Sequence, residues 1–190
     1  MLRRRNPLKP PATARGYRKF GFIGLESFAS YLIFIGVGVN CAWPFVHSWL
    51  VDAYPEATIT GTIFLSAFTT KTAVYFLARA FPGTEELIWI GVAMAGFPIF
   101  YAVIENDLRR VLAYSLNNQL GYMVVGIGIG TALSLNGTTS HAFAHILYKA
   151  LLFMTMGAVL YRTGTTKATE LGGLYKSMPK TAVLCIIGAL

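Results

Sequence analysis

Five apolar stretches, each close to the length that crosses a lipid bilayer, constrain the fold of this chain more than any other feature. A helix needs about 20 consecutive, mostly apolar residues to span the hydrocarbon core. Within lipid every backbone polar group must bond inside the protein, so such stretches form helices. The sequence therefore predicts an all-α, polytopic transmembrane helical bundle, with spans at about 21–45, 59–78, 87–104, 111–135 and 141–161.

The charge balance agrees with a chain embedded in a lipid bilayer. Charged residues make up only 13% of the sequence, against about 25% in soluble domains. The net charge of +8 does not indicate a nucleic-acid partner, because seven of the sixteen Lys and Arg residues lie within residues 1–19. Cys41 and Cys185 both lie in apolar segments without metal or disulfide spacing, and we expect no cofactor.

Two histidines and a lysine form a row in the last long apolar stretch. His141, His145 and Lys149 are spaced four residues apart, which places them on one face of a helix. Lys149 lies about eight residues from one end of the stretch and about twelve from the other, too deep for its side chain to reach water. Ionisable residues inside a membrane span are costly and by default mark a proton or ion path. The alternative is a purely structural packing role.

Lys71 is a second ionisable residue inside an apolar stretch. It lies about twelve residues from one end of the 59–78 stretch and about seven from the other. A lysine that can lose its proton is suited to a relay, whereas the simpler interpretation is a side chain that extends to the membrane surface. The candidate proton relay therefore consists of Lys71, His141, His145 and Lys149.

Prolines, glycines and hydroxyl residues predict where the helices break and begin. Pro44 should kink or end the first helix, and Pro98 marks a second kink site. Asn136-Gly137 predicts a turn between the fourth and fifth spans. Thr58 or Thr60 is expected to cap the helix that follows.

The distribution of basic residues predicts the orientation of the bundle. Connections 46–58, 105–110 and 162–180 hold six Lys and Arg residues, whereas those on the opposite side hold only Arg79. By the positive-inside rule, 105–110 and 162–180 are cytoplasmic. Residues 1–20 are then a basic tail on the opposite side, which we interpret as non-native or disordered. Because the last apolar segment, from Thr181, is too short to cross, we expect the chain to be a truncated part of a longer protein.

Four ordered motifs resemble one known family, the antiporter-like membrane subunits of respiratory complex I and of Mrp-type multisubunit sodium/proton antiporters. The resemblance covers about residues 30–190, and the first two motifs are most similar to those of the Mrp D-type subunits. The motifs are WPFVHSWLVDAYPEAT at 43–58, TKTAVY at 70–75, NDLRRVLAYS at 106–115, and HxxxHxxxKALLF from His141.

The resemblance implies a fold and a set of roles. The family fold is a larger helical bundle with inverted repeats and broken helices. Residues 21–190 would be part of that domain, in a multi-pass protein of a bacterial-type plasma membrane. Lys71 matches the lysine on the helix after the first broken one, and His141, His145 and Lys149 match the histidine/lysine relay. The lysine of the broken helix itself falls at Val39, where this chain departs from the family.

The leading hypothesis is a membrane subunit of a cation/proton antiporter, with other membrane subunits, protons and Na⁺ as partners. The alternative is a proton-pumping subunit of a complex I-like NADH:quinone oxidoreductase or a hydrogenase-linked complex. The sequence shows no catalytic chemistry of its own, so redox chemistry would belong to partner subunits. An inactive structural or pseudogene fragment is a further alternative. Haem ligation is another, but histidines four residues apart on one helix cannot occupy opposite faces of a haem.

Overall fold

The computed structural model describes Leu25 and residues 27–190, and it is helical over most of that length. The predicted tail at residues 1–20 lies outside the described residues. In chain order the elements are α2 Phe28–Asn40, α3 Ser48–Glu56, α4 Ile59–Phe64, η1 Leu65–Thr69, α5 Thr70–Ala80, α6 Glu85–Ile104, α7 Leu108–Ile129, α8 Ala132–Thr163, η2 Ala168–Glu170, α9 Leu174–Ser177 and α10 Pro179–Ala189.

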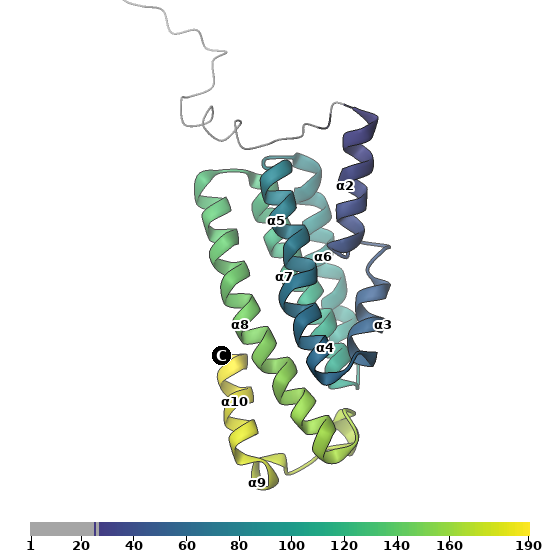
Figure 1. The fold of residues 1–190 in the computed structure, drawn as a ribbon, viewed down its shortest axis with the longest axis vertical. Helices are drawn as coiled ribbons and strands as arrows, with labels where there is room; N and C mark the ends of the chain where they lie inside the picture. The colour runs from purple at the N-terminus through teal and green to yellow at the C-terminus, as the bar shows by residue number, and fades with distance from the viewer. Residues whose placement is uncertain (1–24, 26) are drawn as a thin grey trace, which may run out of the picture.

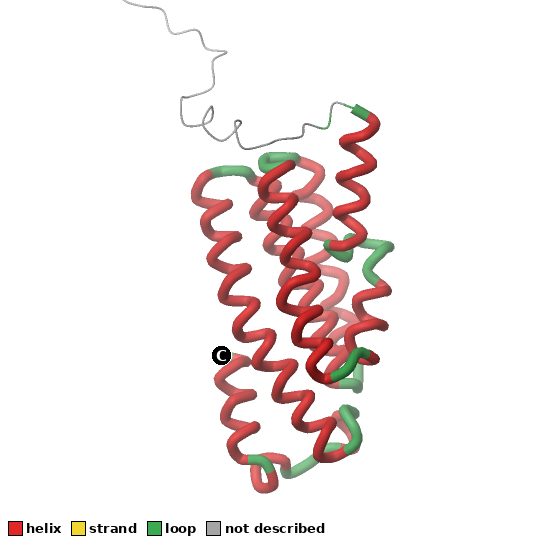
Figure 2. The backbone as a smooth tube through the Cα atoms, in the orientation of Figure 1, coloured by secondary structure: helices red, strands yellow, loops and turns green. Residues whose placement is uncertain are grey.

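The long helices run side by side as a bundle (Figures 1 and 2). α4, η1 and α5 continue one another as a single rod that lies between α8 and the pair α2 and α3 (Figure 1). α2 and α3 follow one another along one flank, and α10 turns back beside α8 (Figure 1). The all-α architecture that the sequence predicts is therefore confirmed for the described residues.

α6 and α7 approach each other more closely than ordinary side chains permit. A Cβ atom placed on Gly121 would lie 2.5 Å from the backbone nitrogen of Ala95, and one on Gly91 would lie 2.7 Å from that of Val125. Both collisions are with backbone, which cannot move aside as a side chain can. Close contact through small residues is the usual way in which membrane helices pack, because lipid supplies no hydrophobic force between them.

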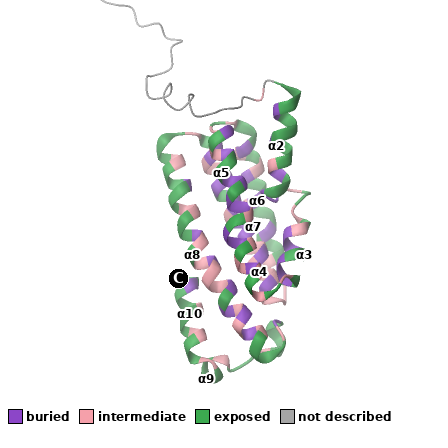
Figure 3. Cartoon of the chain, viewed as in Figure 1, coloured by how far each residue is buried: buried purple, intermediate pink, exposed green. Residues whose placement is uncertain are grey.

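Buried residues face the centre of the bundle, while the outward faces are apolar but exposed (Figure 3). α7 contributes most to the centre, with Leu116, Leu120, Val124 and Ile127 fully buried. Large apolar side chains such as Phe28, Phe100 and Val103 are at least 73% exposed. An exposed apolar surface of this kind fits contact with lipid or with other membrane helices.

Two helices in the described part of the chain, α6 and α8, are long and apolar enough to cross a membrane by length and composition. α7 has a similar length but carries a more polar sequence. α6 also continues through Pro98, so the helix does not end there.

The predicted break at Pro44 is confirmed. α2 ends at Asn40, and the chain resumes helical structure only at Ser48. Ala42 and Phe45 adopt positive φ angles of 59° and 71°, which place the backbone in the left-handed region on both sides of the proline. The Trp49 indole donates to the Val39 carbonyl at 3.0 Å, bonding the two half-helices across the break.

The predicted turn at Asn136-Gly137 is wrong, because both residues lie inside α8. The chain turns earlier, at Gly130, whose φ of 66° ends α7. Thr131 then caps α8 by accepting a bond from the Ser134 amide. A cap with a left-handed glycine before it outweighs the modest helix propensity cost of one Asn and one Gly. α7 therefore ends at Ile129, and α8 begins about nine residues before the predicted span.

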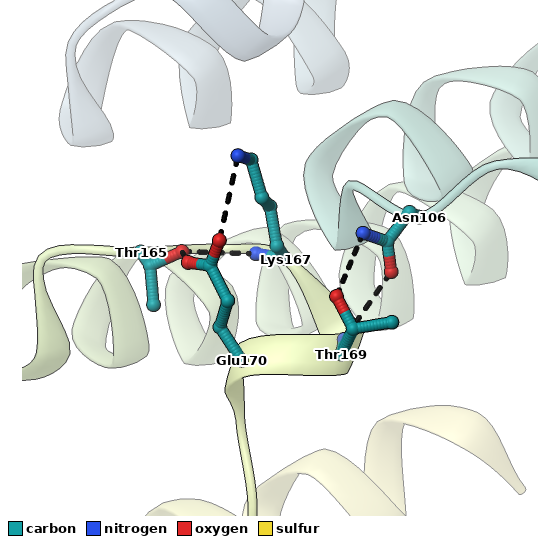
Figure 4. A network of polar contacts seen from close by, with 5 residues as sticks. All are labelled: Asn106, Thr165, Lys167, Thr169 and Glu170. Atoms are coloured by element: carbon teal, nitrogen blue, oxygen red, sulfur yellow. Dashed lines mark hydrogen bonds and ion pairs between the residues drawn. The ribbon is translucent and has the colours of Figure 1, made fainter.

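The 105–110 and 162–180 connections lie at the same end of the bundle and are bonded to each other (Figure 4). Asn106 donates to the Thr169 hydroxyl at 3.0 Å and accepts from the Thr169 amide at 3.2 Å. Asp107 and Lys167 form an isolated antiparallel bridge. The predicted grouping of these connections on one side agrees with this arrangement, whereas their cytoplasmic location stays a prediction.

Candidate functional site

Lys71 lies one residue into α5, directly after a π-helical turn formed by Leu65–Thr69. Its side chain is 7% exposed. The Lys71 ammonium donates to the Ser66 carbonyl at 2.8 Å and to the Thr70 hydroxyl at 3.4 Å, both on its own rod. π turns within α-helices often mark functional positions. Here the turn presents a carbonyl oxygen to the lysine.

Lys149 lies on α8 and is 2% exposed. Its ammonium donates to the hydroxyl of Ser115, on α7, at 2.9 Å. A long charged side chain this deep in a bundle cannot reach solvent. The sequence places Lys149 inside the bundle but gives no signal that Ser115 is its partner, because the two residues meet only through the packing of α7 on α8.

His145 is fully buried, one helical turn before Lys149, and neither of its ring nitrogens has a hydrogen-bond partner among the described residues. An imidazole always carries at least one donor, and a buried polar group without a partner is costly. His141 lies one turn further back with its ring 6.1 Å from that of His145, and its Nε2 is also buried and unpartnered. Buried groups with open hydrogen-bonding capacity are what a chain of water molecules would require.

The structure brings the four predicted residues into one electrostatically connected group. Lys71 interacts electrostatically with His141, His145 and Lys149, although it lies on a different helix from all three. Two further buried oxygens without partners, Ser66 Oγ and Asn117 Oδ1, lie on helices of the same interior. The cluster is therefore polar, buried and incompletely bonded.

Val39 and Asn40, where the resemblance places the altered residue of the broken helix, lie on the outer face of α2. Both are exposed, Val39 to 43%. Cys41 instead points inward, is fully buried and interacts electrostatically with Lys71. The side chains of Val39 and Asn40 therefore do not line the interior that contains the lysines.

Arg109 differs from its predicted role as a basic loop residue. It begins α7 and is only 5% exposed, whereas its neighbour Arg110 is exposed enough to pair weakly with Asp52 at 3.9 Å. The Asp-Leu-Arg-Arg sequence does not reveal which arginine turns inward. The Arg109 guanidinium donates to the carbonyls of Tyr54, Pro55 and Ala57 and to the Thr62 hydroxyl.

The histidine pair does not offer the geometry of a haem site. His141 and His145 lie on the same face of α8, so they cannot ligate a metal from opposite sides. Among the described residues, no group of three or more His, Cys, Asp or Glu side chains could hold a metal ion. The chemistry available at the cluster is proton binding and hydrogen bonding.

Comparison with known proteins identifies the family. Residues 20–190 match the family model described as NADH:quinone oxidoreductase/Mrp antiporter, TM. The chain is 37% identical over 170 residues to F(420)H(2) dehydrogenase subunit L of Methanosarcina mazei, covering 84% of this chain and 25% of that protein. It is 35% identical over 159 residues to the D-type subunit of the Na(+)/H(+) antiporter of Alkalihalophilus pseudofirmus, covering 76% of this chain and 31% of that protein.

The fold agrees with a solved structure of the same kind. A chain of the Mrp complex from Dietzia sp. DQ12-45-1b superposes with a TM-score of 0.79 at 28% identity, covering 91% of this chain and 35% of that one. The chain thus spans about a quarter to a third of the length of the relatives that it matches.

Proposed function

Because this chain belongs to the family of antiporter-like membrane subunits shared by NADH:quinone oxidoreductases and Mrp antiporters, we propose that it forms part of the proton path of such a subunit. A proton would pass among Lys71, His141, His145 and Lys149 through water molecules held in the bundle interior. The subunit would work in a multi-pass position in the plasma membrane, together with other membrane subunits.

The observation that carries this proposal is His145, fully buried with both ring nitrogens unpartnered among the residues that the structure describes. A histidine retained only for packing would be expected to have a hydrogen-bond partner, because most buried polar atoms do. His145 instead lies one turn from Lys149 and interacts electrostatically with both lysines. Such a position supports transient bonding to water and transfer of a proton between neighbours.

The source of energy distinguishes two versions of the proposal. In a cation/proton antiporter, which we favour, proton flow would be coupled to the opposing flow of Na⁺ or another cation. In a redox-driven complex, electron transfer in partner subunits would drive it. The two relatives named above differ by only two points of identity and carry one name of each kind, so both versions have support.

Substitution of Lys149 in the full-length subunit, within its assembled complex, tests the proton path. Lys149→Met keeps the length of the side chain but cannot bind a proton, and we expect it to abolish proton transport without lowering abundance. Lys149→Arg should also impair transport, since arginine does not release its proton. Lys176→Met, at an exposed position on α9, is the matched control.

Transport is measured in inverted membrane vesicles and normalised to the amount of subunit. Dependence of the flux on added Na⁺ or on a respiratory substrate separates the antiporter from the redox-driven version. Wild-type proton transport in Lys149→Met would contradict the relay and support a packing role. An inert fragment predicts no transport in the wild-type complex either.

A further inference from the structure

Tyr54, on the short helix after the break, connects Arg109 to the turn that holds Lys71. We propose that Tyr54 is a positioning residue for Lys71 and acts through the π turn at Leu65–Thr69. The inference rests on the proposed proton path in one respect only: it assigns Tyr54 a role in placing a member of that path.

The Tyr54 hydroxyl is bonded to the π turn itself. It donates to the Leu65 carbonyl at 2.9 Å, and the Thr70 side chain lies beside it. Tyr54 is fully buried, so water does not compete freely for this bond. Leu65 is the first residue of the π turn, and Thr70 immediately precedes Lys71. The hydroxyl thus contacts both ends of the turn.

Lys71 depends on the next carbonyl along the same turn. Its ammonium donates to the Ser66 carbonyl, and the Ser66 peptide group directly follows that of Leu65. Successive peptide groups share a Cα atom, so fixing the direction of one restricts the next. A hydrogen bond that holds the Leu65 carbonyl therefore also favours the orientation in which the Ser66 carbonyl meets Lys71.

The other end of Tyr54 is fixed as well. Its own carbonyl accepts bonds from Arg109 at 3.3 Å and from the Thr62 hydroxyl at 2.9 Å. Its ring packs edge-to-face against Trp49 at 6.2 Å and Phe153 at 6.3 Å. With both its backbone and its ring held, Tyr54 presents its hydroxyl to the turn in one place.

The alternative to a positioning role is that Tyr54 merely fills space in the core. The two roles differ in what the hydroxyl contributes, because the ring alone satisfies the packing. Removing the hydroxyl leaves the Leu65 carbonyl buried without this partner, and the backbone of the turn then gains freedom to relax. Relaxation would move the carbonyl that accepts from Lys71.

The test is Tyr54→Phe in the full-length subunit within its complex, compared with Tyr75→Phe. Tyr75 lies on the same rod as Lys71 but is 66% exposed, so the control removes a hydroxyl that does not contact the turn. We expect Tyr54→Phe to accumulate normally and to reduce proton transport about 3- to 10-fold, the range expected for loss of one hydrogen bond. The pH profile of transport should also move, whereas Tyr75→Phe should match the wild type in both.

A structure of the Tyr54→Phe complex by electron cryomicroscopy supplies a readout that does not depend on transport. We expect the Lys71 ammonium to leave the Ser66 carbonyl in this variant. An ammonium that stays in place overturns the proposal even if transport falls, and so does wild-type transport with a displaced ammonium. Lys71→Met separates the two hypotheses: wild-type transport in that variant contradicts the proton path, while the Tyr54→Phe structure still decides whether Tyr54 places Lys71.

Discussion

Lys71 and Lys149 are similarly buried but are held in opposite ways. Lys71 bonds within its own rod, mainly to the backbone carbonyl of Ser66. Lys149 bonds across helices, to the side-chain hydroxyl of Ser115. The acceptor of Lys71 therefore depends on the shape of one turn, whereas that of Lys149 depends on the packing of α7 against α8.

This difference has a consequence for mutation and for mechanism. A side-chain acceptor can be removed by one substitution, while a backbone acceptor can be removed only by changing the conformation of the chain. Ser115 can also rotate its hydroxyl to donate or accept, as a proton step would need, but the Ser66 carbonyl can only accept. We infer that Lys71 sits in the more fixed environment and Lys149 in the more adjustable one.

The largest effect should come from Arg109→Ala, which breaks the framework on the Lys71 side. Four buried oxygen acceptors would lose the guanidinium, and each unpaired buried group costs about 1–3 kcal/mol. We expect a loss of more than about 3 kcal/mol and low abundance, measured by thermal unfolding and immunoblotting. Arg110→Ala is the matched control, with an exposed ion pair whose loss should cost less than about 1 kcal/mol. Equal effects at both positions would contradict the anchoring role of Arg109.

Ser115→Ala should have the next largest effect, because it removes the hydroxyl that accepts the hydrogen bond of Lys149. Leaving a buried charged donor without this partner is expected to cost about 1–3 kcal/mol and to slow proton transport. Thermal unfolding and vesicle transport measure the two effects. Ser177→Ala, at an exposed hydroxyl on α9, is the control and should change neither.

Thr70→Val should be milder and tests the contrast between the two lysines directly. Lys71 would lose its long 3.4 Å bond to the Thr70 hydroxyl but keep the 2.8 Å bond to the Ser66 carbonyl. We expect about 0.5–1 kcal/mol of destabilisation by thermal unfolding. Thr72→Val, exposed on the same helix, is the control. If Thr70→Val is more harmful than Ser115→Ala, the backbone does not dominate the placement of Lys71.

The smallest effect concerns the exposed connection after α8, which serves as a baseline for both buried sites. The Thr165 hydroxyl, and then Lys167, lower the pKa of the Glu170 carboxyl below its usual 4.5. A lowered folded-state pKa stabilises the protein above the unfolded pKa, and this contribution is lost as the pH falls through the folded value. Melting temperatures followed from about pH 6 to about pH 3 should therefore fall slightly less for Glu170→Gln than for the wild type. An identical pH dependence would show that the contact contributes nothing.

The class of fold and the members of the candidate relay follow from the sequence alone. Long apolar stretches specify membrane helices because lipid leaves the backbone no other partner. Lys71, His145 and Lys149 stand out for the same reason, since an ionisable group inside such a stretch is costly. The break at Pro44 also follows from local chemistry, because proline removes a backbone donor.

The remaining features come from helix packing, because each depends on residues far apart in the chain. Which of Arg109 and Arg110 turns inward is set by the carbonyls at the end of α3, more than fifty residues earlier. The partner of Lys149 is set by the contact of α7 with α8, and the orientation of the turn before Lys71 by the hydroxyl of Tyr54. Asn136 and Gly137 remain helical because a capped and packed α8 outweighs their local preference for a turn. Local propensities are worth about 1 kcal/mol or less per residue, so helix packing overrides them wherever the two disagree.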